Sequence, residues 1–295
     1  MVTNTLFPII PPPEEVLYIL GNGFDLSHGI MSRYADFEQW VKEQGNIRLI
    51  GLMDTFFSNK REFWCDIETA LGEYDEEEIY EYCKPGKAID YDHMMRSVAA
   101  CEDAPDWLFK PVLDEFLKAF HDWVDCIDIT KAKPKMTLYP ESSYLTFNYT
   151  ETLEHVYKIP TSQIKHVHGS RLNEEDSYII GHNKLKSEDL HDTLNGELYF
   201  EQDTKNKIIS WMNKLHKDTS SIIYCNQRFF QTLNIVKHVV VIGHSLYDVD
   251  WPYFDEVNKN IDPNAEWIFN HHTPMDRQRI NLYVNHAGIT NYKIQ

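Results

Sequence analysis

The stretch that decides the fold class is Val16-Leu17-Tyr18-Ile19-Leu20-Gly21-Asn22-Gly23-Phe24-Asp25. Its first five residues are all apolar, which is typical of a strand buried on both faces of a parallel sheet. The glycines that follow end this strand in a turn. The stretch therefore predicts the first strand of an α/β sheet, with a loop at its carboxyl end.

Further apolar runs predict the other strands of this sheet. They are Ser143 to Phe147, Ile164 to Val167, Tyr178 to Ile180, Val239 to Ile242, Trp267 to Phe269 and Tyr292 to Ile294. Helices are expected directly after two of these strands, at Thr150 to Tyr157 and at Trp251 to Asn258. Alternation of strands and helices is typical of an open parallel α/β sheet with right-handed crossovers.

The region after the first strand has a helical periodicity instead. Apolar residues recur three or four positions apart over 37–41, 63–71 and 107–124, and the acidic stretch Glu73 to Glu81 suits a solvated helix face or loop. We expect one α/β domain over residues 1–295 with a helical insertion at roughly Asn46 to Lys135. The insertion is either extra core beside the sheet or a lid that opens on activation.

The composition narrows the class of protein. The 28 Lys and Arg against 46 Asp and Glu give a net charge of −18, which disfavours general nucleic-acid binding but leaves room for a local basic cleft. An apolar content of 42% with 13% aromatics supports a folded core. No apolar run approaches the ~20 residues that span a bilayer, so no membrane association is expected.

The cellular compartment is expected to be the cytoplasm. The N-terminus lacks the basic segment of a signal peptide. The five cysteines are widely spaced and contain no C-x-x-C, which fits a reducing compartment and argues against a disulfide framework or a cysteine-rich zinc site.

Four polar motifs follow predicted strands at their carboxyl ends, where open parallel sheets bind ligands. The first is Gly21 to Asp25, followed by Ser27-His28-Gly29. Glycines after a strand let backbone N–H groups approach a pyrophosphate, but Leu26 replaces the third glycine of the dinucleotide fingerprint. The alternative is a tight turn without a ligand. Asp25 can contact ribose hydroxyls or stabilise its own turn.

The second motif is Phe147-Asn148-Tyr149-Thr150. The amide of Asn148 both donates and accepts hydrogen bonds, which suits it to orient a sugar hydroxyl or a water. The alternative interpretation is an Asx turn or a helix cap, and Thr150 also suits the cap.

The third motif is His166-Val167-His168-Gly169. On a strand, His166 and His168 point to the same face. A histidine at a strand end suits a general base near neutral pH. The alternatives are a pair of metal ligands and two hydrogen-bonded core residues.

The fourth motif is Gly243-His244-Ser245-Leu246, followed by Asp248 and Asp250. The glycine and the hydroxyl suit contacts to phosphate or ribose, whereas the alternative is a turn that caps the next helix. Gly181-His182-Asn183 repeats this pattern less specifically.

Together these motifs resemble the AbiH family of phage abortive-infection proteins, from about Leu17 to Asp250. The resemblance rests on Gly21 to Asp25 with His28-Gly29, Phe147 to Thr150, His168-Gly169 and Ile242 to Leu246. The helical stretch Phe63 to Gly72 fits that family as well. The resemblance implies a defence protein that responds to a phage-derived trigger.

The same motifs are similar, more distantly, to the Rossmann-like fold of sirtuins, which binds NAD. The resemblance implies ligand contacts at Gly21, Gly23, Gly243 and Ser245, and catalytic roles for Asn148 and His168. We expect Asn22, Asp25 and Asp248, which belong to the same motifs, to contact the ligand as well. Thr150 and Phe147 depart from the sirtuin aspartate and glutamine, and the sirtuin four-cysteine zinc module is absent. Lysine deacylation is therefore disfavoured.

The expected function is hydrolysis of the nicotinamide–ribose bond of NAD or a related nucleotide, with no metal. A second hypothesis is a nucleotide-sensing module without catalysis that acts through a partner. A third is a metal-dependent phosphoesterase that uses Asp25, His166, His168 and His182. The oligomeric state stays open.

Overall fold

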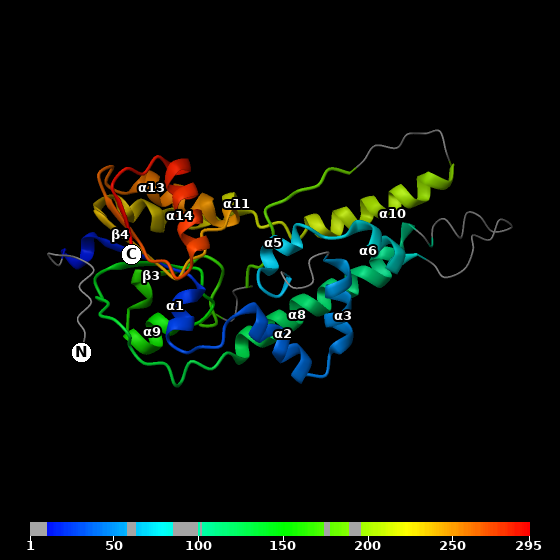
Figure 1. Cartoon of the computed structure of the whole chain (residues 1–295), viewed down its shortest axis with the longest axis horizontal. Helices are drawn as coiled ribbons and strands as arrows, with labels where there is room; N and C mark the ends of the chain where they lie inside the picture. Colours follow the sequence, from blue (N-terminus) through cyan, green and yellow to red (C-terminus); the bar gives the residue numbers. More distant parts are fainter. Residues whose placement is uncertain (1–10, 58–62, 85–99, 101, 174–177, 189–195) are drawn as a thin grey trace. The chain divides into compact units, whose positions relative to one another are not determined.

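The structure is a computed structural model that describes residues 11–57, 63–84, 100, 102–173, 178–188 and 196–295. The chain divides into two compact units (Figure 1). Unit 1 comprises segments 1–33, 124–179 and 218–295, and unit 2 comprises segments 34–123 and 180–217.

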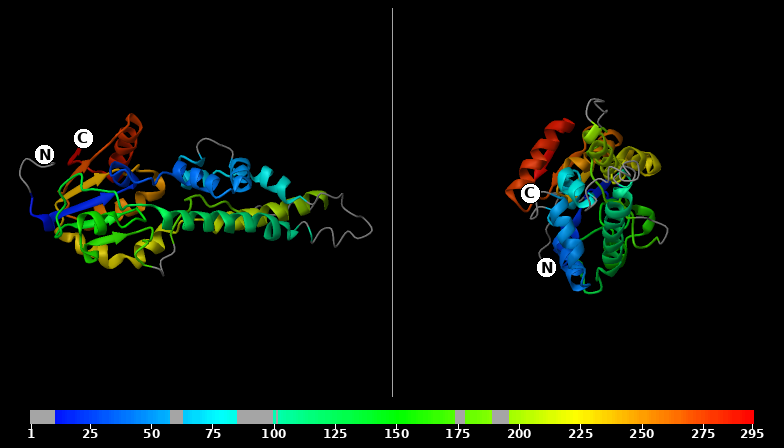
Figure 2. Two further views of the ribbon diagram at one scale, coloured as in Figure 1. Left: turned by 90° about the horizontal axis from the view of Figure 1, so that it is seen from below. Right: turned by 90° about the vertical axis from the view of Figure 1, so that its right-hand side faces the viewer.

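Unit 1 is built on an open sheet whose six described strands are all parallel, in the order β3-β2-β1-β4-β5-β6 (Figure 2). The strands are β1 Val16–Leu20, β2 Ser143–Thr146, β3 Ile164–His166, β4 His238–Ile242, β5 Glu266–Phe269 and β6 Tyr292–Ile294. This order is the one that Rossmann-like domains use, with its switch point between β1 and β4. The expected open parallel α/β sheet is confirmed.

Helices cover both faces of this sheet. On one face, Leu17 and Ile19 pack in a core with Phe254 and Tyr283, and on the other, Tyr18 and Leu20 pack with Phe24. The first face carries α12 Gln227–Gln231, η5 Thr232–Ile235, α13 Trp251–Asn260 and α14 Pro274–Ala287, and the second carries α1 Asn22–Ser27 and α9 Thr152–Tyr157. Burial on both faces explains why β1 is entirely apolar.

The remaining described elements of unit 1 are short, except for α8, which begins in unit 2. They are η1 Pro13–Glu15, η4 Thr161–Gln163, α11 Thr219–Cys225, η6 Asp248–Asp250 and the end of α8 Lys110–Cys126. The predicted helices at Thr150 to Tyr157 and Trp251 to Asn258 correspond to α9 and α13.

Unit 2 is helical where it is described. Its other elements are α2 Tyr34–Glu43, α3 Ile47–Phe56, α5 Ile67–Leu71, α6 Glu76–Cys83, the π-helical turn η3 Pro105–Phe109 and α10 Gly196–Asn213. Its core is aromatic: the Phe37 ring lies within 5.9 Å, centroid to centroid, of the rings of Trp64, Phe116, Phe120 and Trp123.

The two chain segments of unit 2 are joined by ion pairs. Lys217 is fully buried, and its Nζ lies 2.5 Å from Oε1 of Glu68. At the surface, Lys184 pairs with Glu73. Unit 2 therefore contains segment 180–217 as well as segment 34–123. The prediction of a single domain with an insertion at 46–135 made no provision for the second segment, and that range includes residues outside the described part.

The predicted strand at Tyr178 to Ile180 is wrong. Its residues are not in a strand, although the Ile179 N–H donates to the His168 carbonyl over 2.9 Å. A single backbone hydrogen bond is not enough to pair this segment with a strand of the sheet. Among the helices that the structure describes, none is long and apolar enough to cross a membrane.

Candidate functional site

The candidate site lies at the carboxyl ends of β1 to β4, which are neighbours in the sheet. Backbone bonds continue beyond these strands: the Gly21 N–H donates to the Ile242 carbonyl (3.0 Å), and the Phe147 N–H donates to the Leu20 carbonyl (2.9 Å). The loops that carry the four motifs therefore start at the same edge, as parallel pairing requires.

The glycines of the first and fourth motifs allow the backbones of the loops after β1 and β4 to approach each other closely. A Cβ on Gly21 would lie 2.6 Å from Cα of His244, and one on Gly23 would lie 2.6 Å from Cα of Gly243. Gly243 also has a φ of +65°, which favours glycine. Close packing of the loops after β1 and β4 explains these glycines without a ligand, and their predicted contact with phosphate stays a prediction.

Asp25 is a buried carboxylate in α1, 1% exposed. The Thr150 hydroxyl donates a hydrogen bond to its Oδ2, while its Oδ1 is buried without a hydrogen-bond partner. Burial raises the pKa of Asp25 to about 6, against the opposing effect of nearby polar groups and of the charge on Arg171. Asp25 can thus accept a hydrogen bond from a ligand hydroxyl or carry a proton itself.

Asn148 connects the loops after β1, β2 and β3. Its Nδ2 donates to the Gly21 carbonyl over 3.2 Å, and its carbonyl accepts a bond from Nδ1 of His166 over 2.8 Å. The side chain is 8% exposed. These bonds hold the amide at the edge of the sheet, beside Asp25.

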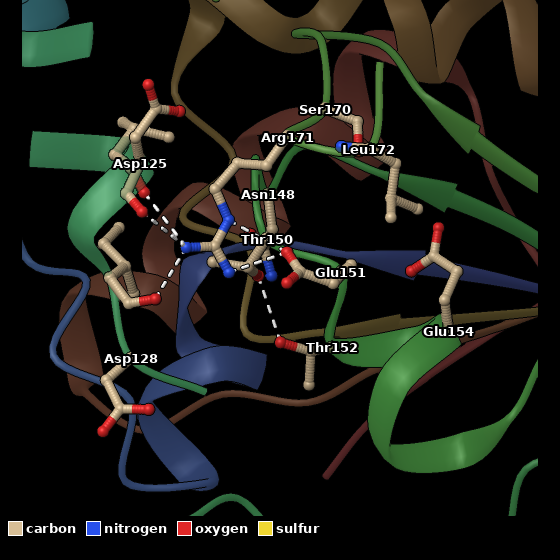
Figure 3. Close-up of polar contacts among 12 residues, drawn as sticks. Asp125, Asp128, Asn148, Thr150, Glu151, Thr152, Glu154, Ser170, Arg171 and Leu172 are labelled. Atoms are coloured by element: carbon tan, nitrogen blue, oxygen red, sulfur yellow. Dashed lines mark hydrogen bonds and ion pairs between the residues drawn. The ribbon is translucent and has the colours of Figure 1, made fainter. Parts of the chain in front are cut away.

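Arg171 ties the same loops to the end of α8 (Figure 3). Its Nε and Nη2 donate to Oε2 of Glu151 over 2.9 and 2.7 Å. Its Nη1 donates to the Ile127 carbonyl over 2.6 Å and to the Val124 carbonyl over 3.2 Å. The motif analysis missed Arg171, because its partners are distant in the sequence.

His168 lies in a second group of side chains at this edge. Its Nε2 is 3.6 Å from Oδ1 of Asp250, and Nε2 of His244 is 3.4 Å from Oδ2 of the same carboxylate. The Phe147 ring packs against both imidazoles, with centroid distances of 5.1 Å to His168 and 4.3 Å to His244. Phe147 directly precedes Asn148, so the two groups adjoin.

His244 also fixes a turn. Its Nδ1 accepts a hydrogen bond from the Leu246 N–H over 2.9 Å, and Leu246 has a φ of +53°, a backbone conformation that side chains disfavour. Because Nδ1 accepts, a neutral His244 carries its hydrogen on Nε2, the atom that faces Asp250.

A family model described as "Bacteriophage abortive infection AbiH" matches residues 17–271. The chain belongs to the AbiH family. No curated protein and no solved structure gives a significant match. Membership suggests a role in abortive infection, in defence against bacteriophage.

The match to AbiH covers every candidate site residue singled out from the sequence, but the structure brings only some of them together. Asp25 and Asn148 adjoin, and His168 lies beside Phe147. Asp248 is exposed, whereas Asp250, two residues later, is buried. Ser245 is partly buried, and no hydrogen bond of its hydroxyl is described.

The metal-dependent alternative for this AbiH chain finds no support in the geometry. β3 ends at His166, whose two ring nitrogens face the Asn148 carbonyl and Oε1 of Glu154. His182 lies in unit 2, where its Nε2 donates to the Met212 carbonyl. Across the described ranges, no three His, Cys, Asp or Glu side chains are arranged to hold a metal ion.

Proposed function

We propose that this AbiH protein binds NAD or a related nucleotide at the carboxyl edge of the unit 1 sheet and hydrolyses its nicotinamide–ribose bond. The observation that carries the proposal is that Asn148 and His168 follow the neighbouring strands β2 and β3, and that Asn148 adjoins the buried Asp25. Rossmann-like sheets bind nucleotides at this edge.

Asp25 supports the proposal through its unpartnered oxygen. Its Oδ1 is buried without a hydrogen-bond partner, and a ribose hydroxyl is a donor that would satisfy it. The space beside Gly21 and Gly23 is filled by residues 243 and 244, so the proposal rests on Asp25, Asn148 and His168 rather than on a glycine cradle.

The proposed reaction breaks the bond between C1′ of the ribose and the nicotinamide nitrogen, and the electron pair leaves with nicotinamide. A water oxygen forms the new bond to C1′. Asn148 orients this water or a ribose hydroxyl, and the His168 imidazole accepts the proton that the water releases. The products are nicotinamide, ADP-ribose and one proton.

The test is nicotinamide release by the purified full chain with NAD, alone and with lysate of phage-infected cells. We expect His168→Ala to lower the rate by ~10²–10⁴-fold while NAD binding persists, and Asn148→Ala to weaken both binding and turnover. His155→Ala, an exposed histidine of α9, is the matched control. If no condition releases nicotinamide, the hydrolase proposal is wrong.

A non-catalytic nucleotide sensor is the second candidate. One observation favours it: the Thr150 hydroxyl, in place of the sirtuin aspartate, is engaged with Asp25. Tight nucleotide binding without turnover, together with capture of a partner only in the bound state, would select the sensor over the hydrolase.

A further inference from the structure

Asp250 is a buried carboxylate shared by two imidazoles. It is 6% exposed, and His168 and His244 are 4% and 8% exposed. One carboxylate oxygen faces each ring, Oδ1 toward His168 (3.6 Å) and Oδ2 toward His244 (3.4 Å). These distances exceed those of good hydrogen bonds, and each becomes an ion pair when its imidazole is protonated.

The surroundings of this group are largely aromatic. Phe147 and Phe254 pack against His244, with centroid distances of 4.3 and 4.9 Å. Titratable groups that face His168 include Asp250, Tyr149 after β2 and Tyr253 on α13. His244 faces the other oxygen of Asp250. Since Asp250 is only 6% exposed, its charge acts more strongly on the two imidazoles than it would at the surface.

The two imidazoles face Asp250 in different ways. His244 has its Nδ1 engaged with the Leu246 N–H, so it presents Nε2–H to Asp250 while neutral and helps to hold the carboxylate in place. His168 faces the other oxygen of the carboxylate through its own Nε2. When His168 accepts a proton, its ring becomes an imidazolium. The negative charge of the Asp250 carboxylate stabilises this imidazolium.

We propose that Asp250 is the positioning residue of His168: it orients the imidazole and stabilises the imidazolium that forms when His168 takes the proton from water. This deepens the proposed function and rests on the role of His168 there. His244 acts in turn on Asp250, by holding the carboxylate between the two rings.

The first test needs no substrate. The ring resonances of His168, assigned with His168→Gln, are titrated by NMR in the full chain. In Asp250→Asn we expect the His168 midpoint to move to lower pH by about one unit or more. Asp262→Asn, which removes the same charge from the loop after α13, should leave the midpoint unchanged. An unchanged midpoint in Asp250→Asn would overturn the proposal.

A second variant keeps the test decisive if Asp250→Asn does not fold. In His244→Asn the new amide oxygen can still accept the Leu246 N–H, while the contact to Asp250 is lost. Asp250 then acts on His168 alone, so the midpoint should move to higher pH. A shift to lower pH, or none, would contradict the role assigned to His244.

Activity separates this inference from the proposed function. In Asp250→Asn, the rate of nicotinamide release should fall about 10²-fold, and the acidic limb of its pH–rate profile should move to lower pH. Asp250→Glu should restore part of the rate. Release with no effect of Asp250→Asn on midpoint or rate would refute the inference alone. A shifted midpoint in a protein that never releases nicotinamide would refute hydrolysis alone.

Discussion

The Thr150 hydroxyl donates a hydrogen bond to the buried carboxylate of Asp25, which joins the loop after β2 to helix α1. This bond favours the charged carboxylate, but burial outweighs it and raises the pKa of Asp25 to about 6. The unfolded chain releases the same proton near pH ~4. Asp25 therefore links the stability of unit 1 to pH.

We predict that Asp25 destabilises the folded protein as the pH rises from about 4 to about 6. In this window the unfolded state loses the proton while the folded state keeps it, so the free energy of unfolding should fall by about 3 kcal/mol and then level off. Asp25→Asn should lack this decrease. Urea denaturation of both proteins across the window measures the difference.

The control for this prediction is Asp248→Asn, because Asp248 is exposed. Its free energy of unfolding should follow that of the unchanged protein at each pH. If Asp25→Asn shows the same pH dependence as the unchanged protein, the pKa of Asp25 is the same in the folded and unfolded states, and the prediction is wrong. A stable Asp25→Asn that also binds NAD more weakly would support the ribose contact.

A second prediction concerns the contact between the loops after β1 and β4. A Cβ on Gly243 would lie 2.3 Å from the Phe24 nitrogen, whereas one on Gly29 would meet nothing within 4 Å, and both residues have a positive φ. Gly29→Ala should cost ~1–2 kcal/mol from backbone strain alone. Gly243→Ala should cost clearly more, as measured by urea denaturation, and equal costs would refute the close approach.

A third prediction concerns the buried ion pair of unit 2. Lys217→Met removes the positive charge that pairs with the buried carboxylate of Glu68, so the free energy of unfolding should fall by ~3–5 kcal/mol. Lys184→Met breaks the exposed pair with Glu73 and should cost ~1 kcal/mol at most. Adding Glu68→Gln to Lys217→Met should recover much of the loss, and a double variant as unstable as the single one would contradict this account.

A fourth prediction concerns metals. Because His244 presents Nε2–H to Asp250 and both nitrogens of His166 face protein oxygens, neither ring is placed to coordinate a metal ion. A chelator should change neither the thermal unfolding temperature nor nicotinamide release. If the chelator lowers the unfolding temperature or the rate of nicotinamide release, and a single divalent metal restores it, the result would support the phosphoesterase hypothesis.

Much of unit 1 could be predicted from local pattern. The strands β1 and β4 are apolar throughout because both of their faces are buried, and this leaves a clear run in the sequence. Tyr178 to Ile180 has the same kind of run, but its residues form no strand, and Ile180 is a buried residue of unit 2. A short apolar run reports burial and does not report pairing.

The site was predictable only in part. Parallel strands place their carboxyl ends at one edge, and that placed Asn148 and His168 near each other. The choice of Asp248 over Asp250 as a contact depended on the short turn η6, which buries one and exposes the other. Nothing in the local sequence distinguishes the two. Arg171 was missed for a similar reason, because its partners are set by tertiary structure.

The central place of β1 in the sheet determines when, during translation, the candidate site can assemble. The strand β1 pairs with β2 on one side and with β4, beginning at His238, on the other. A nascent chain that has exposed β1, β2 and β3 still lacks Gly243, His244 and Asp250. The segment from His238 to Asp250 must therefore be synthesised before the proposed catalytic edge can assemble, so a toxic activity at this edge would be absent until then.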